Sequence, residues 1–220
     1  MQIIKKNFLI IFLFFYLIFG SLASIKSGIS FDENHEEINW KDNVNISKKL
    51  SRHFFYGEEI DLKILERTVG YGIGFQLISQ PIQFLLKDLI ANDITDFGRH
   101  LLAKHFVVFL FFFISGIFFY LILKKIIENE NFCKTGTIIY LLYPYLFGQS
   151  LFSPKDVPFM SIWLICTYLS LNLFERLIDK KDISNFNTIL FTFMTSYLLS
   201  IRIAGVLIFL QYVVTFIIYL

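Results

Sequence analysis

Long apolar runs constrain the fold of this chain more than any other feature of its sequence. Six such runs occur, at residues 7–25, 101–123, 137–152, 159–174, 188–201 and 206–220. A helix of roughly 20 predominantly apolar residues matches the thickness of a bilayer's hydrocarbon core. The runs therefore predict an all-α integral membrane protein with about six transmembrane helices, the shorter runs included.

The composition excludes the main alternatives to a membrane fold. Hydrophobic residues make up 55% of the 220 residues and charged residues only 17%, whereas about 25% of a soluble domain is charged. Disordered chains are poor in aromatic residues, and this chain has 28 Phe. A net charge of +2 without a basic stripe argues against nucleic-acid binding. Two Cys provide neither a disulfide framework nor a zinc site.

The chain divides into three segments. Residues 1–25 form a first transmembrane helix or signal anchor, 26–100 a long external loop with most of the charge, and 101–220 a multi-helix transmembrane region. A second interpretation of the first segment stays open, because basic residues, an apolar run and small residues in that order also suit a cleaved signal peptide. Both interpretations place the N-terminus in the cytoplasm.

The external loop contains a stretch with helical spacing of its apolar residues, from Phe75 to Leu89, with a kink expected at Pro81. An amphipathic helix lying on the membrane surface fits this pattern. A core helix of a small external domain fits it as well.

The basic residues predict the orientation of the helices. With the N-terminus inside, the loops that fall in the cytoplasm are the more basic ones, as the positive-inside rule requires. They carry Lys5, Lys6, Lys124, Lys125, Lys134, Arg176, Lys180 and Lys181. The short external turns then carry Lys155 with Asp156, and Arg202, on the same face as Asp32 and Glu33. Ionisable groups at membrane depth usually have a function, so these residues predict a site on the outer face. Solvated loop charges are the alternative.

Three motifs resemble those of a known family. An acidic pair, Asp32 and Glu33, follows the first helix; the string FGQSLFSPKDVPF occupies residues 147–159; and SIRIAG occupies residues 200–205. In order and spacing they resemble the N-terminal part of membrane glycosyltransferases of the C superfold. Within that group, glycosyltransferase family 39 includes the protein O-mannosyltransferases and enzymes similar to the lipid A aminoarabinose transferases. The resemblance covers the whole chain, which ends earlier than such relatives and is therefore expected to be a fragment.

The resemblance implies transfer of a sugar from a polyprenyl-phosphate-linked donor to a protein or glycolipid acceptor at the bilayer. It implies that Asp32, with Glu33 beside it, is the catalytic base, an assistance worth about 10²–10⁴-fold in rate. Arg202 and Lys155 would bind the donor phosphate, since cations meet phosphate oxygens well. Asp156 would support Lys155 or the sugar, although a local ion pair at a tight turn is the simpler interpretation.

The acidic cluster that follows Asp32 contains His35 and Glu36, which could at most contribute to a divalent-cation site. The alternative is a solvated, acidic start of a helix. A membrane fold is also compatible with two other functions, that of a transporter and that of a non-catalytic protein. A transporter would place charged residues mid-membrane, but here they lie at the ends of the runs. A non-catalytic membrane protein that retains the fold remains the main rival to an enzyme.

Overall fold

The computed structural model describes residues 2–59, 72–90 and 94–219. The described residues form helices and connecting turns without a strand, which confirms the all-α prediction. The helices are α1 (Gln2–Ser24), α2 (Phe31–Tyr56), α3 (Gly74–Leu86), α4 (Asp96–Ile126), α5 (Glu130–Leu142), α6 (Pro144–Ser150), α7 (Asp156–Ile178), α8 (Asn185–Ile201) and α9 (Ile208–Tyr219), with 3₁₀ turns η2 (Lys87–Leu89) and η3 (Ile203–Leu207).

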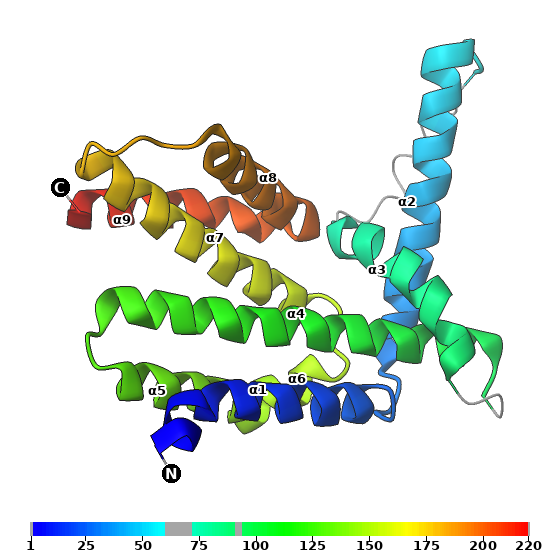
Figure 1. The fold of residues 1–220 in the computed structure, drawn as a ribbon. Coiled ribbons are helices and arrows are strands. Elements are labelled where there is room, and N and C mark those ends of the chain that lie inside the picture. The colour runs from blue at the N-terminus through cyan, green and yellow to red at the C-terminus, as the bar shows by residue number, and fades with distance from the viewer. Residues whose placement is uncertain (1, 60–71, 91–93, 220) are drawn as a thin grey trace.

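Helix α4 is the centre of the bundle. It packs against α1, α3, α5 and α7, and α7 in turn packs against α8 and α9. Figure 1 shows α1, α4, α5 and α9 lying roughly along one direction, with α7 and α8 inclined to them, while α2 and α3 lie at the end where α4 and α7 begin. We call this end of the bundle the α2 end. The C-terminus of α1 lies there too, as do the end of α8 and the start of α9 (Figure 1).

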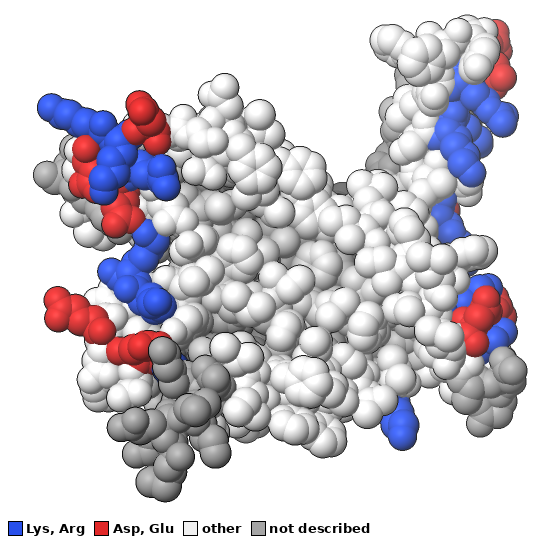
Figure 2. Space-filling view, in the orientation of Figure 1, with Lys and Arg blue, Asp and Glu red and all other residues white. Residues whose placement is uncertain are grey.

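Two of the described helices, α4 and α7, are long and apolar enough to cross a membrane, and shorter apolar helices cover residues 8–24 and 203–218. Figure 2 shows the charged side chains gathered at the two ends of the bundle, with an uncharged surface between them. Residues 137–152, expected to form the third membrane helix, are divided between α5 and α6. The division falls at Pro144, which lacks an amide hydrogen and therefore starts a new helix.

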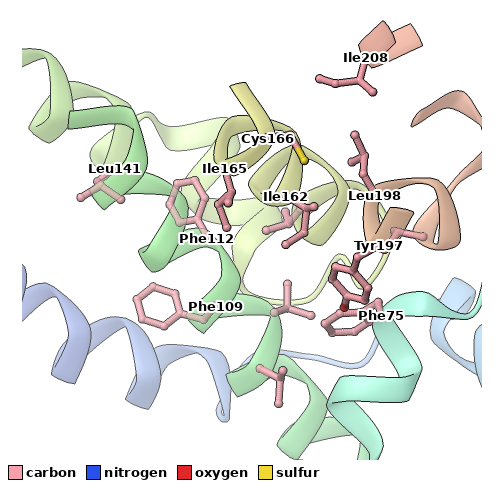
Figure 3. Packing of buried hydrophobic residues seen from close by; sticks show 14 of the residues in the cluster. Phe75, Phe109, Phe112, Leu141, Ile162, Ile165, Cys166, Tyr197, Leu198 and Ile208 are labelled. Carbon is pink, nitrogen blue, oxygen red and sulfur yellow. The ribbon is translucent and has the colours of Figure 1, made fainter. Parts of the chain in front are cut away.

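The core surrounds α4 (Figure 3), whose Phe109 and Phe112 are fully buried. Helix α1 joins this core. Its Tyr16 hydroxyl donates to the Leu141 carbonyl oxygen at 2.7 Å, and a Cβ at Gly20 would lie only 2.0 Å from the Phe109 ring. The first helix is thus an integrated part of the bundle.

Two glycines allow α3 to approach the end of α8. A Cβ on Gly72 would lie 2.1 Å from the Ser200 carbonyl oxygen, and one on Gly74 would lie 2.1 Å from the Ser200 hydroxyl. Figure 3 shows the consequence, with Phe75 of α3 beside Tyr197 of α8. The kink residue Pro81 lies inside α3, which continues to Leu86 and is followed by η2.

Candidate functional site

Three carboxylates on one face of α2 are buried at the α2 end. Glu33, Glu36 and Glu37 are 0%, 7% and 4% exposed, and their spacing of three and four residues places them on the same side of a helix. Burial of a charge is costly unless the charge is paired. Each of these carboxylates has a basic partner from elsewhere in the chain, so the expectation of a solvated acidic helix start is wrong.

Glu33 pairs with His105 of α4. Glu33 Oε2 lies 2.7 Å from His105 Nε2, and both side chains are 0% exposed. The other ring nitrogen, Nδ1, lies 2.8 Å from the Ser27 hydroxyl and 3.2 Å from the Ser24 carbonyl oxygen. The Ser30 amide also donates to Glu33 Oε1, at 2.6 Å, at the start of α2. Glu33 therefore fastens α2 to α4 and is closed to an incoming acceptor.

Glu37 and Glu36 make the other two contacts of this face. Glu37 Oε2 lies 3.2 Å from Lys104 Nζ, whose side chain is fully buried, and Gln80 of α3 donates to the same oxygen at 3.3 Å. Glu36 pairs with Lys155, just before α7. The face thus joins α2 to α3, α4 and the turn that precedes α7.

The predicted phosphate-binding residues lie together at the α2 end. Arg202, which follows α8, pairs with Asp156 at the start of α7, and its guanidinium lies 5.7 Å from the centre of the Phe159 ring. The side chains of Arg202 and Asp156 are 42% and 68% exposed, and that of Lys155 is 28% exposed. Exposed ion pairs contribute little stability, so an anionic ligand can replace Asp156 on Arg202 at small cost.

Asp32 is the second residue of α2, and its side chain lies outside the described residues. His35 is exposed, and Glu36 is committed to Lys155. Among the residues that the structure describes, no group of three or more His, Cys, Asp or Glu side chains could hold a metal ion. The described residues therefore provide no set of ligands that supports the divalent-cation hypothesis.

An apolar groove lies in the bundle near Arg202 and Asp156. It has a volume of about 260 Å³ and lies between α3, α4, α7 and α8. Its lining is Ile78, Phe111, Ile114, Phe118, Ile162, Ile165, Leu169, Leu190, Phe193, Met194 and Tyr197. At a rise of about 1.5 Å per helical residue, Ile162 lies roughly 9 Å along α7 from Asp156. Tyr197 lies one turn before the end of α8, and Arg202 follows that end. The charged pair thus lies near the end of the groove closest to the α2 end.

Sequence reasoning missed the partners of the α2 carboxylates. Lys104 and His105 interrupt the apolar run at 101–123, and two adjacent basic residues in such a run indicate that acidic partners lie elsewhere in the chain. The spacing of Glu33, Glu36 and Glu37 is the matching signal. No protein-family model, curated protein or solved structure matches this chain.

Proposed function

We propose that this chain belongs to a membrane glycosyltransferase of the C superfold that resembles glycosyltransferase family 39. It would transfer a sugar from a polyprenyl-phosphate-linked donor to a protein or lipid acceptor of the cell envelope. One observation carries the proposal: a partly exposed cation, Arg202, lies near the end of an apolar groove between helices. A lipid phosphate has the same division into a charged head and an apolar tail.

The topology that supports this proposal is a multi-pass one. The spans are α1, α4, the α5–α6 pair, α7, α8 and α9, with the N-terminus in the cytoplasm and the α2 end outside. Lys124 and Lys125 end α4 and Arg176 lies in the last turn of α7, all at the end opposite α2 (Figure 1). That distribution agrees with the positive-inside rule. The uncharged surface between the two ends (Figure 2) corresponds to the hydrocarbon core.

In this proposal Arg202 binds the donor phosphate. Its planar guanidinium can donate two parallel hydrogen bonds to phosphate oxygens, once the Asp156 carboxylate moves away. Lys155, which pairs with Glu36, adds positive charge beside Arg202. The hydrocarbon tail of the donor occupies the groove between α4, α7 and α8, where it is removed from water.

The transfer itself is a single displacement with inversion at the anomeric carbon. The acceptor oxygen or nitrogen bonds to that carbon, its proton passes to the Asp32 carboxylate, and the bond from the carbon to the phosphate oxygen breaks. The negative charge on the departing lipid phosphate is stabilised by Arg202. Glu33 has a positioning role: its hydrogen-bonded pair with His105 fixes the first turn of α2, where Asp32 is the residue before it.

Binding of a polyprenyl phosphate without sugar to the detergent-solubilised protein tests this site. Arg202→Ala should weaken binding about 10- to 100-fold, because a hydrogen bond to a charged group contributes about 1.5–3 kcal/mol. Arg176→Ala, the same substitution at the opposite end of the bundle, is the matched control and should bind normally. Equal affinities of the two variants would contradict the proposed donor site.

A non-catalytic membrane protein with this fold is a second candidate. The observation in its favour is that the three buried carboxylates of α2 are all paired within the chain, as a purely structural clamp would have them. The two candidates differ in binding: the non-catalytic protein has no reason to hold a polyprenyl phosphate at Arg202.

A further inference from the structure

The second half of α2 extends away from the bundle. Figure 1 shows α2 crossing the direction of α4 and continuing well beyond the neighbouring helices. We call residues 43–56 the distal arm. Every residue from 47 to 59 is exposed. An isolated helix of this length is marginally stable in water, and the arm continues the packed first half of α2, so a surface that covers the arm would stabilise it.

The chemistry of the distal arm is that of an interfacial segment. Its tip carries three consecutive exposed aromatic residues, Phe54, Phe55 and Tyr56, at 86%, 77% and 80% exposure. One to two turns before the tip lie Lys48, Lys49 and Arg52, all exposed. Residues 43–56 contain no acidic residue, and the exposed Glu58 and Glu59 follow the tip. Aromatic rings beside cations are typical of helices that lie at the boundary between lipid headgroups and acyl chains.

A groove beside the arm also combines basic and apolar side chains. It is open, has a volume of about 420 Å³, and lies between α2 and the start of α3. Its α2 wall carries Lys48, Ser51 and Arg52 together with apolar side chains, and Ile73 and Leu77 are on the opposite wall. Donors and cations beside apolar side chains suit a phosphate headgroup with the beginning of an acyl chain.

The position of the arm relates these features to a bilayer. Helices α4 and α7 are the two long apolar helices, and the arm projects sideways from the end where they begin (Figure 1). If α4 and α7 cross the membrane, the arm lies along the membrane plane at the level of the headgroups.

We propose that the distal arm docks on the surface of an anionic bilayer. Lys48, Lys49 and Arg52 contact lipid phosphates, and the aromatic tip at residues 54–56 enters the boundary of the acyl chains. The inference depends on the membrane-spanning orientation and is independent of glycosyl transfer. Each cation near an anionic membrane shifts the ratio of docked to undocked arm about fivefold, and three together about a hundredfold.

A fluorescent label on the arm tests this proposal in the reconstituted protein. Ser51→Cys in a variant with Cys133→Ala and Cys166→Ala takes an environment-sensitive dye at one place. We compare vesicles of neutral phosphatidylcholine with vesicles that also contain phosphatidylglycerol. In the anionic vesicles the emission should shift to the blue, spin-labelled lipid should quench it, and high salt should reverse both effects, because salt screens surface charges.

Charge reversal provides the control. Lys48→Glu, Lys49→Glu and Arg52→Glu together should abolish the shift, and Lys180→Glu with Lys181→Glu at the opposite end should leave it unchanged. Inorganic phosphate added to neutral vesicles should have no effect if a lipid surface is the ligand; a shift there would assign the arm to free phosphate and contradict the proposal. Equal emission in both lipids, or a shift that survives charge reversal, would also overturn it.

Discussion

Removal of the Glu33 carboxylate is the sharpest test of how α2 is held. Glu33 and His105 are both fully buried, and their side chains lie 2.7 Å apart. Loss of one partner from such a pair leaves the other charge buried and unpaired, which costs about 3–5 kcal/mol. For a chain of this size, 1 kcal/mol corresponds to about 2–4 °C in the unfolding temperature. Glu33→Ala should therefore lower that temperature by about 10 °C.

Thermal unfolding in detergent, with the double variant included, measures this effect. Glu33→Ala with His105→Ala should be less destabilised than the sum of the two single variants, because the double variant leaves no buried charge unpaired. Glu33→Gln keeps the shape and an acceptor and should fall between the wild type and Glu33→Ala. Glu175→Ala, which breaks an exposed pair with Lys125, should cost less than about 1 kcal/mol.

Two results would refute this reasoning. Additive effects of the Glu33 and His105 substitutions would show that the two side chains are not coupled. An unchanged unfolding temperature in Glu33→Ala, combined with lost sugar transfer, would return Glu33 to the catalytic role that the family resemblance implies.

Three further substitutions test the packing and the groove. Gly74→Ala should destabilise the protein by about 1–3 kcal/mol, because the new Cβ would lie 2.1 Å from the Ser200 hydroxyl; thermal unfolding measures the loss, and unchanged stability would show that α3 does not approach α8 this closely. Tyr16→Phe should cost about 1 kcal/mol by removing the hydrogen bond to the Leu141 carbonyl, and a neutral result in the same assay would argue that α1 is not integrated in the bundle. Met194→Trp should fill part of the groove and weaken polyprenyl phosphate binding without lowering stability by more than about 3 kcal/mol; undiminished binding would place the lipid tail elsewhere.

The sequence predicts which end of the bundle the charged residues occupy, but it does not predict which of them form ion pairs with one another. The alternation of apolar runs placed Lys155, Asp156 and Arg202 at one end with the start of α2, and the structure brings them together there. That prediction needs only the count of helices. The pairing of Arg202 with Asp156 could not be predicted, because residues 46 positions apart meet only once α7 and α8 have packed.

The buried carboxylates show why local pattern was not enough. Asp32 to Glu37 is polar in sequence, and polar helix starts are normally solvated. Burial of Glu33 depends on His105, 72 residues away, and the polar pattern of residues 32–37 does not by itself identify that partner. The glycines just before and at the start of α3 are a similar case, because Gly72 and Gly74 are required by the close approach of Ser200, which lies far away in the sequence.

Sugar transfer from a labelled polyprenyl-phosphate donor is the most direct measurement of the proposed chemistry. The protein is reconstituted in vesicles together with envelope acceptors, and the label that reaches the acceptors is counted. Asp32→Asn should reduce the rate by about 10²–10⁴-fold, the contribution of a general base, with donor binding retained. Asp42→Asn, the same change at an exposed position of α2, should leave the rate unchanged. Equal rates for the wild type and Asp32→Asn would contradict the account.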